Sequence, residues 1–189
     1  NNGGAGIAAT GVGNLSLRDV ISSNNGERGL DVSSSGDLSL TVVTARDNGA
    51  EAIVAASVGD VILDTVITNA DISITAADQI TVAGTVDSQS GEVTLEAIGA
   101  IQINSSVTTG GGHFTARADT DLTFGAGGTL ATEGGTVVLR ADDDGDASGS
   151  GGALTMADGS WANSGSGTMA LAADEAITVS RLATTNDTA

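Results

Sequence analysis

The chain has 189 residues. Its formal net charge is −18, because it contains 24 Asp and Glu but only 6 basic residues, all of them Arg. This charge argues against binding to nucleic acid or anionic membranes, which needs cationic side chains, and no apolar run is long enough to span a membrane. Cys is absent, which excludes disulfides and thiol chemistry, and aromatic residues are only 2%, so the apolar content is Ala, Val, Ile and Leu.

Residues 1–13 have the sequence NNGGAGIAATGVG and resemble the last part of a repeating unit. After them, two apolar residues separated by one residue recur along the chain, and the residue between them is polar in every pair except Val61/Leu63. These first pairs are Leu15/Leu17, Leu38/Leu40, Val61/Leu63, Ile80/Val82, Ile101/Ile103, Leu122/Phe124, Leu154/Met156 and Ile177/Val179. Successive pairs are 23, 23, 19, 21, 21, 32 and 23 residues apart. A spacing of two sends both side chains to one face of a strand, so each pair predicts a short strand facing the core.

Two further apolar positions follow the first pairs. One single position is occupied by Ile21, Val43, Val66, Val86, Val107, Leu130 and Ala162. A second pair follows at Leu30/Val32, Ile53/Ala55, Ile72/Ile74, Val93/Leu95, Phe114/Ala116, Val137/Leu139 and Met169/Leu171. Three apolar positions in a repeat of this length are typical of one coil of a β-solenoid.

We therefore expect an all-β fold, a parallel β-helix of about 7–8 coils of 19–23 residues, with the right-handed winding usual for parallel connections. Gly and Asp or Asn at the turns, as in Gly59-Asp60, agree with this expectation, as does the absence of Pro. An antiparallel β-sandwich is the main alternative, but that fold gives no reason for the apolar positions to recur in the same order in successive units. The whole range 1–189 is expected to be one solenoid segment, either continued by further coils in a longer chain or stacked end to end on other copies.

The acidic segment 141–152 accounts for the 32-residue step, and we expect it to be a loop inserted into one coil. Asp142, Asp144 and Asp146 alternate as the ligands of a calcium loop do. However, Ala147 stands where an EF-hand loop needs Gly, and Glu is absent from the twelfth position. A solvated acidic loop is the simpler interpretation, and a calcium ion held by the three Asp residues is the alternative. No other cofactor is expected.

Trp161 is the only Trp, and alignment of the repeats places Ala162 inward and Trp161 outward. An outward Trp could stack on a sugar or on a neighbouring fibre, although covering a loop is the more frequent role. His113 is the only His and lies in a turn, so it offers no nucleophilic triad.

Two further functions remain as alternatives: a binding module for a glycan or for ice, and a polysaccharide-active enzyme. Outward Thr residues recur beside the first pairs at Thr81, Thr123, Thr155 and Thr178, and a flat Thr array could order ice, although Ile62 and Gln102 interrupt it. A polysaccharide-active enzyme would need a cluster of carboxylates with a basic residue in a groove. We expect no catalysis, because the six Arg residues are scattered and are expected to pair with nearby carboxylates.

Residues 59–103 and 151–182 carry a resemblance to a known family. Their sequences are GDVILDTVITNADISITAADQITVAGTVDSQSGEVTLEAIGAIQI and GGALTMADGSWANSGSGTMALAADEAITVSRL. These repeats resemble those of giant bacterial surface proteins of the filamentous-haemagglutinin type, the β-strand-repeat adhesins. The resemblance implies an extracellular, right-handed parallel β-helix at the cell surface that acts in adhesion, filaments or biofilm. It implies self-association or contact with glycans and other cells as the partners, and it supplies no catalytic residue.

Overall fold

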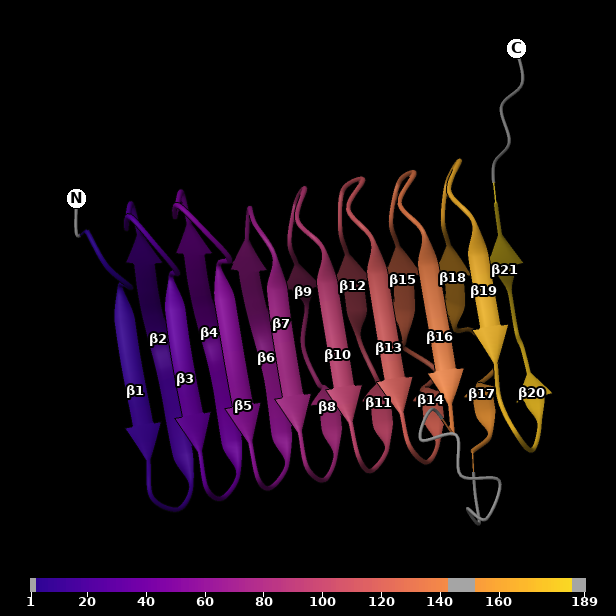
Figure 1. The fold of residues 1–189 in the computed structure, drawn as a ribbon. Helices are drawn as coiled ribbons and strands as arrows, with labels where there is room; N and C mark the ends of the chain where they lie inside the picture. The colour runs from indigo at the N-terminus through magenta and orange to yellow at the C-terminus, as the bar shows by residue number, and fades with distance from the viewer. Residues whose placement is uncertain (1–2, 143–151, 185–189) are drawn as a thin grey trace.

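Parallel strands stacked coil upon coil form the computed structural model, which describes residues 3–142 and 152–184 (Figure 1). One sheet has eight strands; seven are formed around the second apolar pairs, and the first is formed around Ile7 and Ala9. Its strands, in spatial order, are β1 (Ile7–Gly11), β3 (Leu30–Ser34), β5 (Ile53–Ser57), β7 (Ile72–Ala76), β10 (Val93–Ala97), β13 (Phe114–Ala118), β16 (Val137–Ala141) and β19 (Met169–Ala172). The order advances by one coil at each step, which defines a β-solenoid.

The other sheet has thirteen strands and holds both the first pairs and the single apolar positions. In the first three coils, one long strand carries both: β2 (Leu15–Ser23), β4 (Leu38–Arg46) and β6 (Val61–Thr68). In later coils the strand is split into β8 (Ile80–Val82) and β9 (Val86–Asp87), β11 (Ile101–Ile103) and β12 (Ser106–Thr108), β14 (Leu122–Phe124) and β15 (Thr129–Ala131), β17 (Leu154–Met156) and β18 (Trp161–Asn163), and β20 (Ile177–Thr178) and β21 (Leu182–Ala183).

The winding can be followed in Figure 1. The nearer strands point down and the farther, fainter strands point up, while the chain advances from left to right. This winding is right-handed. The predicted all-β solenoid with about seven coils is thus confirmed, and the antiparallel sandwich is wrong because every strand pair in the described residues is parallel.

The core is one continuous column of apolar side chains. Leu63 pairs in register with Val82, Val82 with Ile103, and Ile103 with Phe124, and all four residues have 0% exposure. The second pairs form a matching file in the eight-stranded sheet, for example Ile74, Leu95 and Ala116. The two files face each other across the narrow interior, and this arrangement lets residues as small as Ala fill it.

One apolar position predicted from the sequence is wrong by one residue. Val20, not Ile21, pairs with Val43 and faces the core, whereas Ile21 is 78% exposed. The preceding residue, Asp19, has a φ of 53°, and this left-handed residue turns the strand and shifts the alternation of its side chains. Val42 and Thr65 occupy the same bend in the next two coils with φ values of 52° and 58°.

Val42 is expected to be a strained residue whose replacement stabilises the protein. A β-branched side chain is disfavoured at positive φ, and Val42 is 44% exposed, so it contributes little to the core. We expect Val42→Asn to raise the free energy of unfolding by about 1 kcal/mol, because Asn tolerates the left-handed region. Urea denaturation followed by circular dichroism would measure the change. Val58→Asn is the control, since Val58 is also exposed but lies outside the left-handed region; an equal gain in both variants would contradict the interpretation.

Candidate functional site

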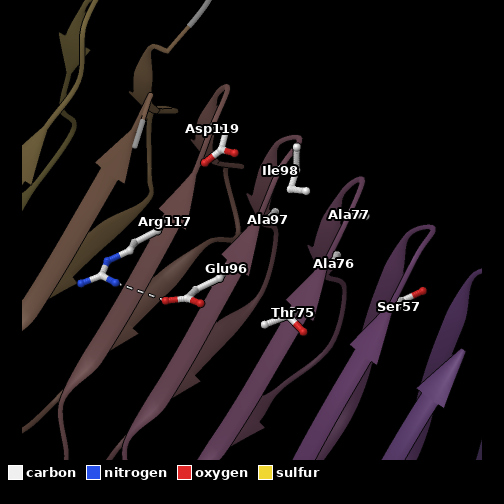
Figure 2. Close-up of a pocket in the computed structure, with 9 residues that line it drawn as sticks. All are labelled: Ser57, Thr75, Ala76, Ala77, Glu96, Ala97, Ile98, Arg117 and Asp119. Atoms are coloured by element: carbon white, nitrogen blue, oxygen red, sulfur yellow. Dashed lines mark hydrogen bonds and ion pairs between the residues drawn. The ribbon is translucent and has the colours of Figure 1, made fainter. Parts of the chain in front are cut away.

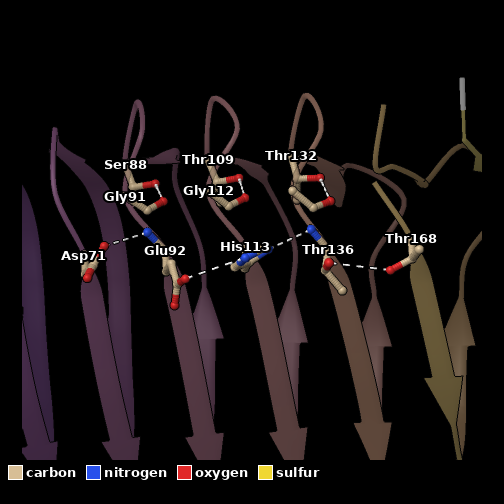
Figure 3. Close-up of polar contacts among 11 residues, drawn as sticks. Asp71, Ser88, Gly91, Glu92, Thr109, Gly112, His113, Thr132, Thr136 and Thr168 are labelled. Carbon is tan, nitrogen blue, oxygen red and sulfur yellow. Dashed lines mark hydrogen bonds and ion pairs between the residues drawn. The ribbon is translucent and has the colours of Figure 1, made fainter. Parts of the chain in front are cut away.

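A repeated turn with a buried hydroxyl leads from the thirteen-stranded sheet to the eight-stranded sheet (Figure 3). In each case a Ser or Thr hydroxyl donates to the carbonyl oxygen of the Gly three residues later. The donors and acceptors are Ser88 and Gly91, Thr109 and Gly112, Thr132 and Gly135, and Ser164 and Gly167. The four hydroxyl residues have 0% exposure, so these bonds satisfy polar groups that close one edge of the core.

A file of polar side chains runs outside these turns, at the start of successive strands of the eight-stranded sheet (Figure 3). Asp71 Oδ1 accepts the N–H of Glu92 at 2.8 Å, and Glu92 Oε1 lies 3.8 Å from His113 Nε2. His113 Nδ1 accepts the N–H of Thr136 at 2.9 Å. Both nitrogens of this exposed His therefore face neighbouring coils, which gives His113 a role in joining them.

An open depression of about 450 Å³ lies at the end of the eight-stranded sheet where its strands enter the next turn (Figure 2). Ala97 and Ile98 form part of its apolar lining, and Glu96, Arg117 and Asp119 supply charge. Arg117 Nη1 lies 3.2 Å from Glu96 Oε1, and both side chains are nearly half exposed. The depression therefore presents an ion pair and a second carboxylate beside an apolar surface. Sequence analysis missed this group, because its members come from successive coils and meet only once the register is known.

Trp161 lies at a second, smaller hollow on the outer face of the thirteen-stranded sheet. Ala162 is fully buried and Trp161 only partly, in agreement with the predicted inward and outward directions. The hollow measures about 140 Å³ and is lined also by Asn163 and Arg181. Strand β18 pairs with β21 of the following coil, and the N–H of Ala162 donates to the carbonyl oxygen of Arg181 at 3.0 Å. This pairing places Arg181 beside Trp161. The binding role of Trp161 stays a prediction.

Of the three Asp residues suggested for calcium, only Asp142 is described; Asp144 and Asp146 lie outside the described residues. Asp142 follows β16 with a φ of 61°. Across 3–142 and 152–184 the structure groups no three His, Asp or Glu residues that could hold a metal ion. Calcium binding by the 141–152 segment therefore remains a prediction.

The outward Thr residues share one file, as the repeats indicated. Ser16, Ser39, Ile62, Thr81, Gln102, Thr123, Thr155 and Thr178 pair in register across the thirteen-stranded sheet. Three consecutive coils carry Thr, at Thr123, Thr155 and Thr178, and Ile62 and Gln102 interrupt the rest of the file. A regular Thr array thus extends over a short part of this face.

Ion pairs link three of the six Arg residues, Arg18, Arg28 and Arg117, to neighbouring carboxylates, and the pairing expected for the other three stays a prediction. Arg28 Nη1 lies 2.8 Å from Asp31 Oδ2, and Arg28 Nε lies 3.3 Å from Glu51 Oε2 on the next coil. Hydrogen bonds from its own backbone N–H, and then from Arg28, lower the pKa of Glu51. Hydrogen bonds to Asp31 and Glu51 raise the pKa of Arg28. These half-buried groups tie one coil to the next and form no enclosed site.

No family model matches the chain, and neither the curated proteins nor the solved structures include one that is significantly similar to it. In the described part of the chain, no helix is long and apolar enough to cross a membrane. The fold thus defines the class of the protein as a parallel β-solenoid.

Proposed function

We propose that the chain is a structural and adhesive segment of an extracellular fibre at a bacterial cell surface, of the filamentous-haemagglutinin-like type, with no catalytic role. The observation that carries this proposal is the unbroken register of the coils. Each described coil is held to its neighbours by backbone ladders and by side chains stacked in register, so stability grows with the number of coils. Stiffness and length are the properties that such a column offers.

The two ends of the described column support the addition of further coils. Ile177, Val179 and Leu182 occupy apolar core positions in the last coil, yet they are 47%, 44% and 40% exposed. In the first coil Leu15 and Leu17 are only half buried. Apolar side chains at the two end strands of the described residues are stabilised when a coil of a second copy covers them.

Filament formation by the chain tests this proposal. At an ionic strength of about 0.15 M, which limits repulsion between acidic subunits to about 8 Å, we expect rods that join end to end into filaments of constant width. Ile177→Asp should abolish the filaments, because it places a charge at the edge that a second copy would cover. Negative-stain electron microscopy and analytical ultracentrifugation would measure the assembly, and circular dichroism would confirm that the variant is folded.

Ile62→Asp is the matched control, since Ile62 is 42% exposed but projects from the side of the column. It should leave the filaments intact. Dispersed short rods at every protein concentration, or equal loss of filaments in both variants, would contradict the proposal.

A polysaccharide-active enzyme is the alternative with a supporting observation. The depression beside Glu96 and Asp119 contains two carboxylates and Arg117, and a cluster of carboxylates with a basic residue is what such chemistry requires. The ion pair between Arg117 and Glu96 links two successive coils and therefore favours the proposal of a structural segment. Saccharide degradation that Glu96→Gln abolishes would replace the structural proposal with this one.

A further inference from the structure

The hollow beside Trp161 combines an aromatic surface with two polar side chains. Trp161 and Asn163 project from the same outer face of β18, because Ala162 between them points into the core. Arg181 follows on the next coil, next to Trp161, and the three residues line one hollow of about 140 Å³. This volume is below that of a pocket for a drug-sized ligand, so it suits a single small ring.

The polar groups of this hollow are donors. The amide oxygen of Asn163 accepts the N–H of Gly165 at 2.9 Å, so the NH2 group is what Asn163 can offer to a ligand. The guanidinium of Arg181 carries donors only. A complementary ligand must therefore supply acceptor oxygens and an apolar face for the indole, and a pyranose ring has both features.

Charge narrows the class of saccharide further. The ion pairs of the described residues engage Arg18, Arg28 and Arg117 and do not include Arg181. A guanidinium binds a carboxylate through two parallel hydrogen bonds. The net charge of −18 repels a long polyanion, whereas a single terminal carboxylate can pair with Arg181 at a cost in long-range repulsion that salt screens.

We propose that Trp161, Asn163 and Arg181 form a binding site for a terminal acidic sugar, a pyranose that carries one carboxylate. The ring stacks on the indole of Trp161, the carboxylate pairs with Arg181, and a ring hydroxyl accepts a hydrogen bond from Asn163. The inference deepens the adhesive part of the proposed function and rests on it for its biological meaning. Saccharide binding is measured on single rods, so it can fail while filaments form, or hold while they do not.

Fluorescence of the single Trp reports on this site directly, because Trp161 is the only Trp in the chain. The probes are cellobiouronic acid and cellobiose, two disaccharides that differ by one carboxylate. We expect a saturable change with cellobiouronic acid and at least about tenfold weaker binding of cellobiose, the ratio that one good charge-assisted hydrogen bond gives. Arg181→Gln should make the two affinities equal, and Arg181→Lys should retain part of the difference.

Arg18→Gln is the matched control, since Arg18 is exposed on the same sheet in a distant coil. It should leave both affinities unchanged. The absence of a saturable response to either disaccharide would overturn the site. Equal affinities in the unmodified chain, or discrimination that survives in Arg181→Gln, would overturn its assignment to acidic sugars.

Discussion

Gly112→Ala is expected to destabilise the protein by about 3 kcal/mol, the upper range for forcing extra atoms into a packed interior. A Cβ atom on Gly112 would lie 2.1 Å from the carbonyl oxygen of Gly91 in the preceding coil. Gly135 and Gly167 continue the file, with the corresponding distances 1.9 Å to Gly112 and 2.0 Å to Gly135. The obstacle is the backbone of Gly91, which is fixed because its carbonyl oxygen accepts a hydrogen bond from the buried hydroxyl of Ser88. The hydroxyl of Thr109 likewise holds the carbonyl oxygen of Gly112, so a local adjustment cannot relieve the overlap.

Urea denaturation would measure this loss as a lower transition midpoint at an unchanged slope. Gly4→Ala is the control, because a Cβ on Gly4 would meet nothing within 4 Å and its φ is not in the left-handed region. That variant should be neutral or slightly stabilising, since Ala reduces the freedom of the unfolded chain. If Gly112→Ala unfolds at the same urea concentration as the unmodified protein, close stacking of the Gly file is not a requirement of the fold.

The sequence was sufficient to predict the files of the core, because the alternation of apolar and polar residues is local and each coil repeats it. Leu63, Val82, Ile103 and Phe124 could be aligned by their spacing alone, and the structure places them in one register. The same reasoning failed at Ile21. A left-handed residue at Asp19 shifts the phase there, and the neighbouring coils, rather than a local signal, determine which residue of the Val20-Ile21 doublet faces inward.

The candidate sites were harder to predict than the core. The pattern of Ser or Thr followed three residues later by Gly was visible, as in Thr109 to Gly112, but sequence reasoning noted only the Gly. The Glu96–Arg117 pair spans 21 residues and depends on exact register and side-chain direction. At Trp161 the outward direction followed from the alignment, whereas its neighbour Arg181 could be found only after the last coil was placed.

Phe124→Ala is expected to cost about 3–5 kcal/mol, the range for removing a buried Phe. Phe124 has 0% exposure and lies in the core file between Ile103 and Met156 of the adjacent coils. The narrow interior has few side chains that could move into the space, because its walls are strands held in register on both sides. Calorimetry and urea denaturation would measure the loss. Ile177→Ala is the control, since Ile177 is 47% exposed at the last coil and its truncation should cost under about 1 kcal/mol.

The part of the chain that Phe124→Ala destabilises distinguishes a solenoid from an ordinary globular core. In a stacked column each coil contacts only its neighbours, so the weakened interfaces around Phe124 should open before the rest. In a hydrogen-exchange experiment, the backbone amides of β11, β14 and β17 should then lose protection first, while those of the strands around Leu40 and Leu63 stay protected. Uniform loss of protection along the chain would mean that all coils unfold as one unit. Coil-by-coil stability, and with it the growth of a fibre by addition of coils, would then be contradicted.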